Sequence, residues 1–217
     1  IVTSTLLRAD SVWVEGESCR KHNCVKHDWY DNVRKDGLSG KQWLSHYSKQ
    51  RSADATFGIE VEGGRYVLWL RANPLLTRVA YRIGQGQWNQ IDMRGDLRGE
   101  AVISPRPDHR NIAWINAGTV KLARGSHAIT FRLASGRKGL PHHGGIDCFV
   151  LSSDGFVPSG VRKPGDAGKA GPSDWFPVVF QDDVFSDRSV TDMSKLVPAP
   201  AGRLGHLRAV GDKLQFE

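Results

Sequence analysis

Between residues 11 and 155, apolar and polar positions alternate with the two-residue period of β-strands that have one buried face. The run 57–61 shows this alternation clearly, and the apolar run 65–71 follows a turn at Gly63 and Gly64. Two such runs on either side of a glycine turn predict a β-hairpin.

Five more segments show a similar pattern, and glycine-containing turns fall between several of them. The predicted strands are 78–83, 112–116, 118–122, 126–134 and 145–152. No apolar period typical of a helix extends beyond two turns. Many short strands at regular spacing are typical of an all-β sandwich or barrel.

The flanks of this region differ in composition. Residues 1–10 form a short tail, and 156–174 are rich in glycine, proline and charge, which predicts a linker or a surface strap. Residues 175–217 form a C-terminal extension that ends on an apparent strand at 213–216, with no strand to pair with. Either a further domain begins there, or the extension packs back on the sandwich.

The composition narrows the choice of partners for this 217-residue chain. A hydrophobic fraction of 39% is enough for a core, and 24 glycines and 10 prolines suit strands joined by turns. The net charge of +7 favours anionic partners such as an acidic polysaccharide, unless it serves solubility alone. The basic residues are scattered, and no apolar run reaches the ~20 residues that cross a bilayer. We therefore expect no nucleic acid partner and no membrane span.

The three cysteines indicate in which cellular compartment the protein is expected. Cys19 and Cys24 bracket a short loop and can form a disulfide, which would suit an oxidising compartment. Free thiols are a second interpretation, and a zinc site with His22 is a third, although the spacing matches no common zinc motif. Cys148 lies in an apolar strand and has the character of a small buried hydrophobic residue. We expect a secreted protein, extracellular or periplasmic.

Two acidic residues end the first predicted strand. Glu15 and Glu17 are two positions apart, so on a strand their carboxylates point to the same face. Adjacent carboxylates repel unless a cation lies between them. Calcium binds several oxygen ligands, usually carboxylates and carbonyls, so this pair and one further acid form a candidate calcium site. The alternative is two exposed glutamates at a strand end.

Four segments, in this order, resemble the family 6 and family 35 carbohydrate-binding modules. They are VEGE at 14–17, GGRYVLWLRA at 63–72, LARGSHAITFRL at 122–133 and GGIDCFVL at 144–151. The resemblance covers residues 11–152 and implies a β-sandwich of the jelly-roll type that binds carbohydrate without catalysis. It also implies that the first and last strands are neighbours and that structural Ca2+ is held by Glu15, Glu17 and Asp147.

Aromatic and basic residues in several loops are candidates for sugar contact, because aromatic faces pack on sugar C–H surfaces. The modules that this chain resembles have an asparagine near the position of Gly145. The loop before it is basic here, which suits a uronic or sulfated glycan. Tryptophans in predicted strands are expected in the core. The candidate ligand residues are Trp29, Tyr30, Trp43, Trp88, Lys138, His142 and His143.

Three functions fit these residues. The first is binding of a polysaccharide or oligosaccharide beside a covalently linked glycoside hydrolase or lyase domain, because 201–217 resembles the strand before a barrel-type glycoside hydrolase. The second is a structural sandwich that packs on such a domain without binding glycan. The third is an enzyme that uses His142, His143, Asp147 or Asp28, which no GxSxG, HExxH or phosphate-loop motif supports.

Overall fold

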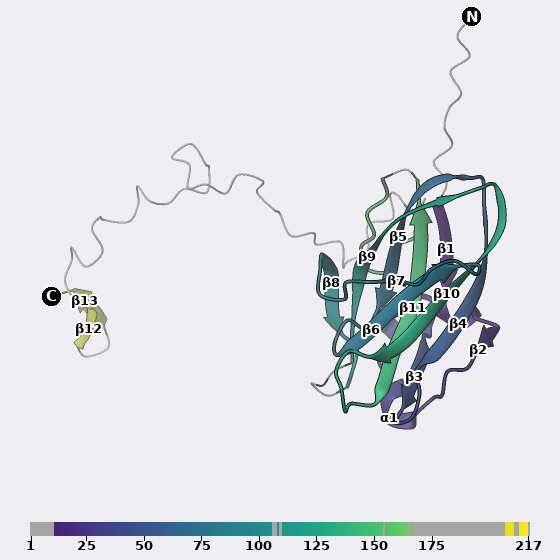
Figure 1. Cartoon of the computed structure of the whole chain (residues 1–217). Coiled ribbons are helices and arrows are strands. Elements are labelled where there is room, and N and C mark those ends of the chain that lie inside the picture. Colours follow the sequence, from purple (N-terminus) through teal and green to yellow (C-terminus); the bar gives the residue numbers. More distant parts are fainter. Residues whose placement is uncertain are drawn as a thin grey trace, which may run out of the picture. The chain divides into compact units, whose positions relative to one another are not determined.

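The computed structural model describes residues 11–105, 108, 110–153, 155–164 and 166, and the backbone of 207–210 and 213–216. The chain divides into two units, 1–168 and 169–217, and each is described by itself. In the first unit two antiparallel β-sheets pack on each other (Figure 1), which confirms the predicted all-β sandwich. No helix among the described residues is long and apolar enough to cross a membrane.

Each sheet has its own strand order. The six-stranded sheet contains β1 (Ser11–Glu15), β11 (His142–Ser152), β5 (Gly64–Ala72), β9 (Asn111–Leu122) and β8 (Leu97–Val102), with β3 (Leu44–Ser48) also paired to β11. The five-stranded sheet contains β2 (Lys21–His22), β4 (Ala53–Val61), β10 (Gly125–Ser135), β6 (Thr77–Ile83) and β7 (Asn89–Gln90). The helical segments are η1 (Gly16–Ser18), α1 (Asp28–Asp31), η2 (Lys35–Gly37) and η3 (Ser39–Lys41).

The main core lies between the two sheets and follows the alternation in the sequence. On β10, Ile129, Phe131 and Leu133 are each 0% exposed, as their shared face predicts. The ring centroid of Phe149 on β11 lies 5.2 Å from that of Phe131 and 5.2 Å from that of Phe57 on β4. These aromatic contacts join both sheets and add to the burial of apolar surface.

The predicted hairpin between 57–61 and 65–71 is wrong. β4 pairs with β2 and β10, whereas β5 pairs with β9 and β11, so the chain crosses between the sheets at Gly63 and Gly64. Both glycines have positive φ, and a Cβ on Gly63 would lie 2.7 Å from the backbone nitrogen of Arg124. A glycine turn is compatible with a hairpin and with a connection between two sheets. The connection between sheets is favoured here because it lets the apolar faces of β4 and β5 pack against each other in the core.

Two further strand predictions change. The segments 112–116 and 118–122 form one strand, β9, which continues through Gly118 at positive φ. In the second unit β13 (Lys213–Phe216) pairs antiparallel with β12 (Leu207–Val210), so the prediction of an unpaired strand is wrong. The Gly-Asp dipeptide at 211–212 is a typical hairpin signal in the sequence. The other residues of 175–217 lie outside the described residues.

The three cysteines are free thiols. Cys19 Sγ donates a hydrogen bond to the Thr56 carbonyl at 3.4 Å, and burial raises the pKa of the Cys24 thiol to about 12. Cys148 is 0% exposed, as expected for a small buried hydrophobic residue. The interpretation as free thiols therefore describes all three residues in this structure.

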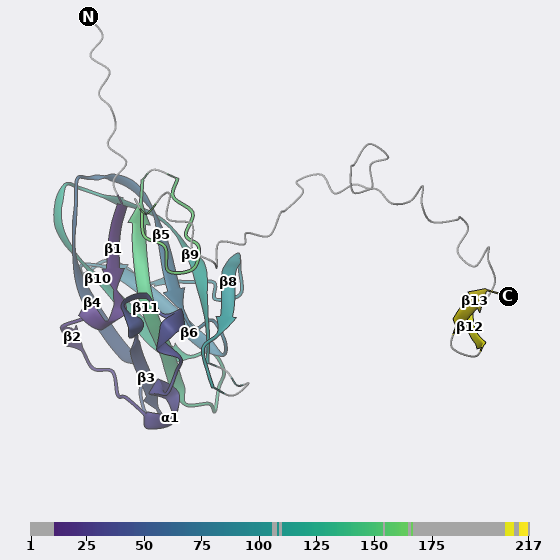
Figure 2. The ribbon, with the colours of Figure 1, turned by 180° about the vertical axis from the view of Figure 1, so that it is seen from behind.

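A second apolar layer covers the outer face of the six-stranded sheet. Trp69 and Trp114 are buried there, and Phe156 packs against them. Trp114 Nε1 donates a 2.8 Å hydrogen bond to the Gly160 carbonyl. This bond holds the segment after β11, which contains Gly160, across β5 and β9 (Figure 2). The described part of 156–174 is therefore a strap on the sheet, one of the two alternatives that its composition allowed.

A buried ion pair joins β5 to β11. Arg71 is 3% exposed and Asp147 is 0% exposed. Arg71 donates from Nη1 to Asp147 Oδ2 at 2.5 Å and to the Gly37 carbonyl at 3.0 Å. The pair therefore also fixes η2, because the guanidinium bridges a strand and a loop.

A β-bulge places Asp147 in this pair. The register between β11 and β5 shifts between Ile146 and Cys148, which makes Asp147 the extra residue. Ile146 and Phe149 both face the core although they are three positions apart. A strict two-residue alternation does not allow that spacing, so the bulge sets which side chains of β11 reach the core.

We expect Arg71→Met to lower the free energy of unfolding by about 3–5 kcal/mol near pH 8, because the Asp147 carboxylate then stays buried without its partner. Burial raises the pKa of Asp147 to about 6 even with Arg71 beside it, so this carboxyl takes up a proton as the pH falls below that value. The loss should therefore be smaller near pH 5. Urea denaturation at both pH values measures it.

The matched control is Arg124→Met, which breaks an exposed ion pair with Glu62 and should change the stability little at either pH. An equal loss at both pH values in Arg71→Met would contradict the role assigned to the Asp147 charge.

Candidate functional site

Two loops that are far apart in the sequence meet at one end of the sandwich. β3 pairs with the first residues of β11, and Tyr47 lies opposite His143. α1 lies beside β3 at the same end (Figure 1). The segments 27–47 and 135–145 are therefore neighbours.

Three aromatic side chains form a surface at this end, which we call the aromatic end patch: His27, Trp29 and Tyr47. Trp29 is 46% exposed, His27 is exposed and Tyr47 is half-buried. The ring centroids of Trp29 and Tyr47 are 5.9 Å apart, and those of His27 and Tyr47 are 4.8 Å apart. Exposed rings with polar edges are the kind of surface on which sugars pack.

Arg110 holds the loop that carries Trp29. It is 2% exposed, and its guanidinium lies 4.8 Å from the centroid of the Trp29 ring. It donates to the carbonyl of Trp29 and, at 2.6 Å, to that of Asn32. Its remaining N–H groups donate to Asp108 and Ser104. Arg110 therefore holds both the backbone and the ring of Trp29 in position.

Tyr30 and Trp43 lie in the interior, which argues against the ligand role that the sequence suggested. They are 1% and 4% exposed, and their rings stack with centroids 5.4 Å apart. The Tyr30 hydroxyl accepts a 2.8 Å hydrogen bond from Asn73. Trp43 covers Gly145 so closely that a Cβ there would lie 2.1 Å from the indole. Trp43 thus fills the space beside the position where the resembling modules have asparagine.

The basic loop contributes three residues with different surroundings. His143 is 7% exposed, and its ring nitrogens face the carbonyls of Pro141 at 3.0 Å and Leu75 at 3.3 Å. His142 is half-buried and accepts a hydrogen bond from a backbone N–H. Lys138 is exposed. Lys138 is therefore open to a ligand, whereas His143 is occupied in holding the loop.

Trp88 belongs to a different surface. It lies between β6 and β7, and the guanidinium groups of Arg82 and Arg132 lie 4.8 Å and 4.1 Å from its ring centroid. Both arginines project from the outer face of the five-stranded sheet. Trp88 and the aromatic end patch are therefore separate candidate surfaces.

The candidate calcium ligands lie at the end of β1. Glu15 is opposite Cys148 on β11, so the first and last strands of the sandwich are neighbours, as the resemblance implies. The strand ends at Glu15, and Glu17 lies in the helical turn η1 with an exposed side chain. The prediction that both glutamates share a strand face is therefore wrong, because a turn replaces the strand after Glu15.

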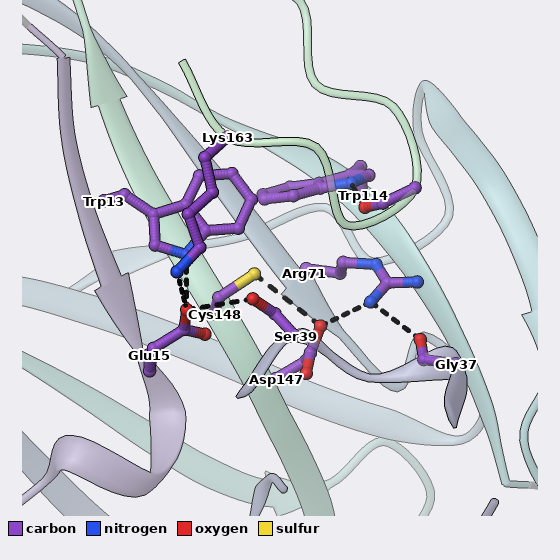
Figure 3. Close-up of polar contacts among 10 residues, drawn as sticks. Trp13, Glu15, Gly37, Ser39, Arg71, Trp114, Asp147, Cys148 and Lys163 are labelled. Atoms are coloured by element: carbon purple, nitrogen blue, oxygen red, sulfur yellow. Dashed lines mark hydrogen bonds and ion pairs between the residues drawn. The ribbon is translucent and has the colours of Figure 1, made fainter. Parts of the chain in front are cut away.

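Glu15 is held by three donors from the protein (Figure 3). Its Oε1 accepts hydrogen bonds from Trp13 Nε1 at 3.0 Å and from the Ser39 hydroxyl at 2.9 Å, and pairs with Lys163 Nζ at 2.6 Å. Lys163 belongs to the strap, and its ammonium also lies 5.7 Å from the Trp13 ring centroid. A cation of the protein itself therefore balances part of the Glu15 charge and fastens the strap.

Two carboxylate oxygens in this region are buried and have no hydrogen-bond partner in the described part of the chain, namely Glu15 Oε2 and Asp147 Oδ1. Unpartnered carboxylate oxygens fit a hard cation such as calcium. Partial shielding of its carboxyl from water raises the pKa of Glu17, although the side chain as a whole is exposed, and the charge of Glu15 also raises it. Among the described residues, however, no three His, Cys, Asp or Glu side chains are grouped closely enough to hold a metal ion. The unpartnered oxygens belong to two of the three candidate ligands, and the side chain of the third, Glu17, is exposed.

Sequence reasoning missed Arg110 and Lys163. Each acts on a residue far away in the sequence, Arg110 on Trp29 and Lys163 on Glu15. No local pattern distinguishes either from the other basic residues of the chain. Their roles follow from burial and from the path of the strap.

No protein-family model matches this chain, and no curated protein matches it. Among solved structures, a family 35 carbohydrate-binding module from an environmental isolate is similar at a TM-score of 0.46 and 14% identity, over 68% of this chain and 96% of the module. The family 35 module of Cellvibrio japonicus Abf62 is similar at a TM-score of 0.42 and 16% identity, over 65% of this chain and 92% of the module.

A larger enzyme is also among the similar solved structures. The Podospora anserina GH26-CBM35 β-(1,4)-mannanase matches at a TM-score of 0.44 and 19% identity, over 70% of this chain. The match spans 29% of the length of that enzyme. Similarity at this level assigns neither a ligand nor an activity to this chain.

Proposed function

We propose that this protein is a non-catalytic carbohydrate-binding module for a polysaccharide or oligosaccharide. The observation that carries the proposal is the exposed indole of Trp29, which the buried Arg110 holds in place beside Tyr47. A ring that is already ordered loses little conformational freedom when a sugar packs on it. The polar edges of the neighbouring rings supply groups that orient sugar hydroxyls.

An acidic polysaccharide is the ligand class that the charge favours. The chain carries a net charge of +7, and Lys138 is exposed in the loop that follows β10. We also propose that the protein is secreted, extracellular or periplasmic, and serves as the accessory part of a covalently linked glycoside hydrolase or lyase. The resemblances at 11–152 and 201–217 support this proposal.

Catalysis by the buried carboxylates has less support. A glycosidase needs two carboxyl groups that face each other across a cleft. Asp147 is 0% exposed and paired with Arg71, and one oxygen of Glu15 already receives three donors. A structural sandwich that binds no glycan is the other candidate. The ordered, exposed ring of Trp29 favours binding over that candidate.

We expect Trp29→Ala to weaken binding of those polysaccharides that the wild type recognises on a glycan array. Loss of one aromatic contact removes about 2 kcal/mol, which is roughly a thirtyfold rise in Kd by isothermal titration calorimetry. Val157→Ala shortens another exposed apolar side chain, 53% exposed, and should leave the Kd unchanged. An unchanged Kd in Trp29→Ala, or turnover of a polysaccharide by the chain itself, would refute the proposal.

We further propose that calcium is a structural ligand held by Glu15, Glu17 and Asp147. The unpartnered oxygens of Glu15 and Asp147 support this proposal. Bound there, calcium supplies positive charge where β1 meets β11. Lys163 and Arg71 already supply part of that charge, so calcium strengthens the fold rather than creating it.

Calcium should raise the melting temperature relative to EDTA, with a gain of about 2.7 kcal/mol in unfolding free energy when its concentration is ~100-fold above Kd. Glu15→Gln should abolish this gain, because it removes a ligand charge. Glu62→Gln, at an exposed glutamate, is the control and should retain it. A wild-type melting temperature that is the same in calcium and EDTA would exclude the site.

A further inference from the structure

A row of polar side chains crosses four strands on the outer face of the five-stranded sheet. Lys21 on β2 lies opposite Thr56 on β4. Thr56 lies opposite Thr130 on β10, and Thr130 lies opposite Arg82 on β6. Residues opposite each other share a face, and three strand spacings of ~4.8 Å separate Lys21 from Arg82 by about 14 Å. The row therefore has a cation at each end and two hydroxyl groups between them.

A groove of about 420 Å³ follows this row, and we call it the sheet-face groove. The four residues of the row line it, together with polar side chains that include Asn23, Asp54 and Gln85. The hydroxyl oxygens of Thr56 and Thr130 are 2.9 Å apart and hydrogen-bonded. Such a lining suits a ligand that is rich in hydroxyl groups.

Trp88 holds two guanidinium groups at the side of this groove. Those of Arg82 and Arg132 lie over its ring, and a guanidinium that lies over an aromatic face keeps the N–H groups at its edge for other partners. The edge of Arg132 is occupied by Asp54, through hydrogen bonds of 2.7 Å and 2.8 Å. Arg82 has neither an ion pair nor a hydrogen-bond partner for its guanidinium in the described part of the chain, and its Nε is buried.

We infer that the sheet-face groove is a second binding surface, which takes a uronate-bearing oligosaccharide with its carboxylate on Arg82. The planar guanidinium edge matches a carboxylate through two parallel hydrogen bonds. Thr56 and Thr130 then lie within reach of sugar hydroxyls, and Lys21 offers a cation to a second acidic sugar. The inference rests on the proposed carbohydrate-binding function and adds to it a second site, with Arg82 as the residue that binds the acidic group.

A nucleic acid fits this groove less well. Its backbone carries a charge at every nucleotide, so binding relies on several cations. Asp54 neutralises Arg132, which leaves Lys21 and Arg82 as the cations of the groove without an ion pair among the described residues. The Trp88 ring is engaged by two guanidinium groups rather than presented for stacking with a base.

Calorimetric titration of the whole chain with an oligogalacturonate tests the inference. We expect Arg82→Gln to raise the Kd about tenfold or more, because a charge-assisted pair is lost. Arg65→Gln removes the same charge from an exposed position on β5 of the other sheet and should leave the Kd nearly unchanged. An uncharged galactan oligosaccharide of equal length should bind more weakly than the oligogalacturonate. Melting temperatures of both variants check that the fold is retained.

An equal loss of affinity in Arg82→Gln and Arg65→Gln would indicate non-specific attraction and overturn the inference. Tighter binding of a sulfated dextran or a single-stranded oligonucleotide than of the oligogalacturonate would also overturn it. Trp29→Ala separates this result from the proposed function. If Trp29→Ala abolishes binding and Arg82→Gln does not weaken it, the sheet-face groove is excluded and the aromatic end patch stands. If the wild type binds no polysaccharide, both proposals fail.

Discussion

The buried ion pair between Arg71 and Asp147 is the interaction on which the architecture around the candidate sites depends. It joins β5 to β11 within the six-stranded sheet and reaches η2 through the Gly37 carbonyl. A charge left alone in the interior costs several kcal/mol, so the two strands, the bulge and the loop must keep their places together. Ser39, two residues after Gly37, then donates to Glu15 and ties the same loop to β1.

The loop that contains Gly37 and Ser39 borders a second, smaller hydrophobic core at the end of the sandwich. Tyr30 and Trp43 pack there with Ile103 and Ile112, outside the space between the two sheets. The buried side chains of this loop already fix the backbone that carries the exposed ring. Binding of a ligand to that ring therefore costs little conformational entropy. Tyr30 and Trp43, the buried aromatic residues of segment 27–47, therefore fix the backbone that carries the exposed Trp29.

Tryptophans that look alike in the sequence have different roles because their surroundings come from remote segments. Trp29 is 46% exposed, while Trp43 is buried against Gly145 of β11. Trp114 is covered by the strap at Gly160, and Trp88, in the loop after β6, lies against Arg82 of β6 and Arg132 of β10. Composition identifies such residues as candidates for binding. Only the path of the chain decides which of them meet solvent.

The two-residue alternation in the sequence was enough to predict an all-β sandwich or barrel and most of its strands, because one buried face per strand leaves a local pattern. The candidate roles of Trp29 and Trp88 could be raised from residue type, since exposed aromatics in polar loops have little structural need. Sheet membership could not be predicted, because the turn at Gly63 and Gly64 suits a hairpin and a crossing alike. The tertiary structure also decided the pairing of Lys163 with Glu15 and the row from Lys21 to Arg82, since contacts between remote segments leave no periodic signal in the chain.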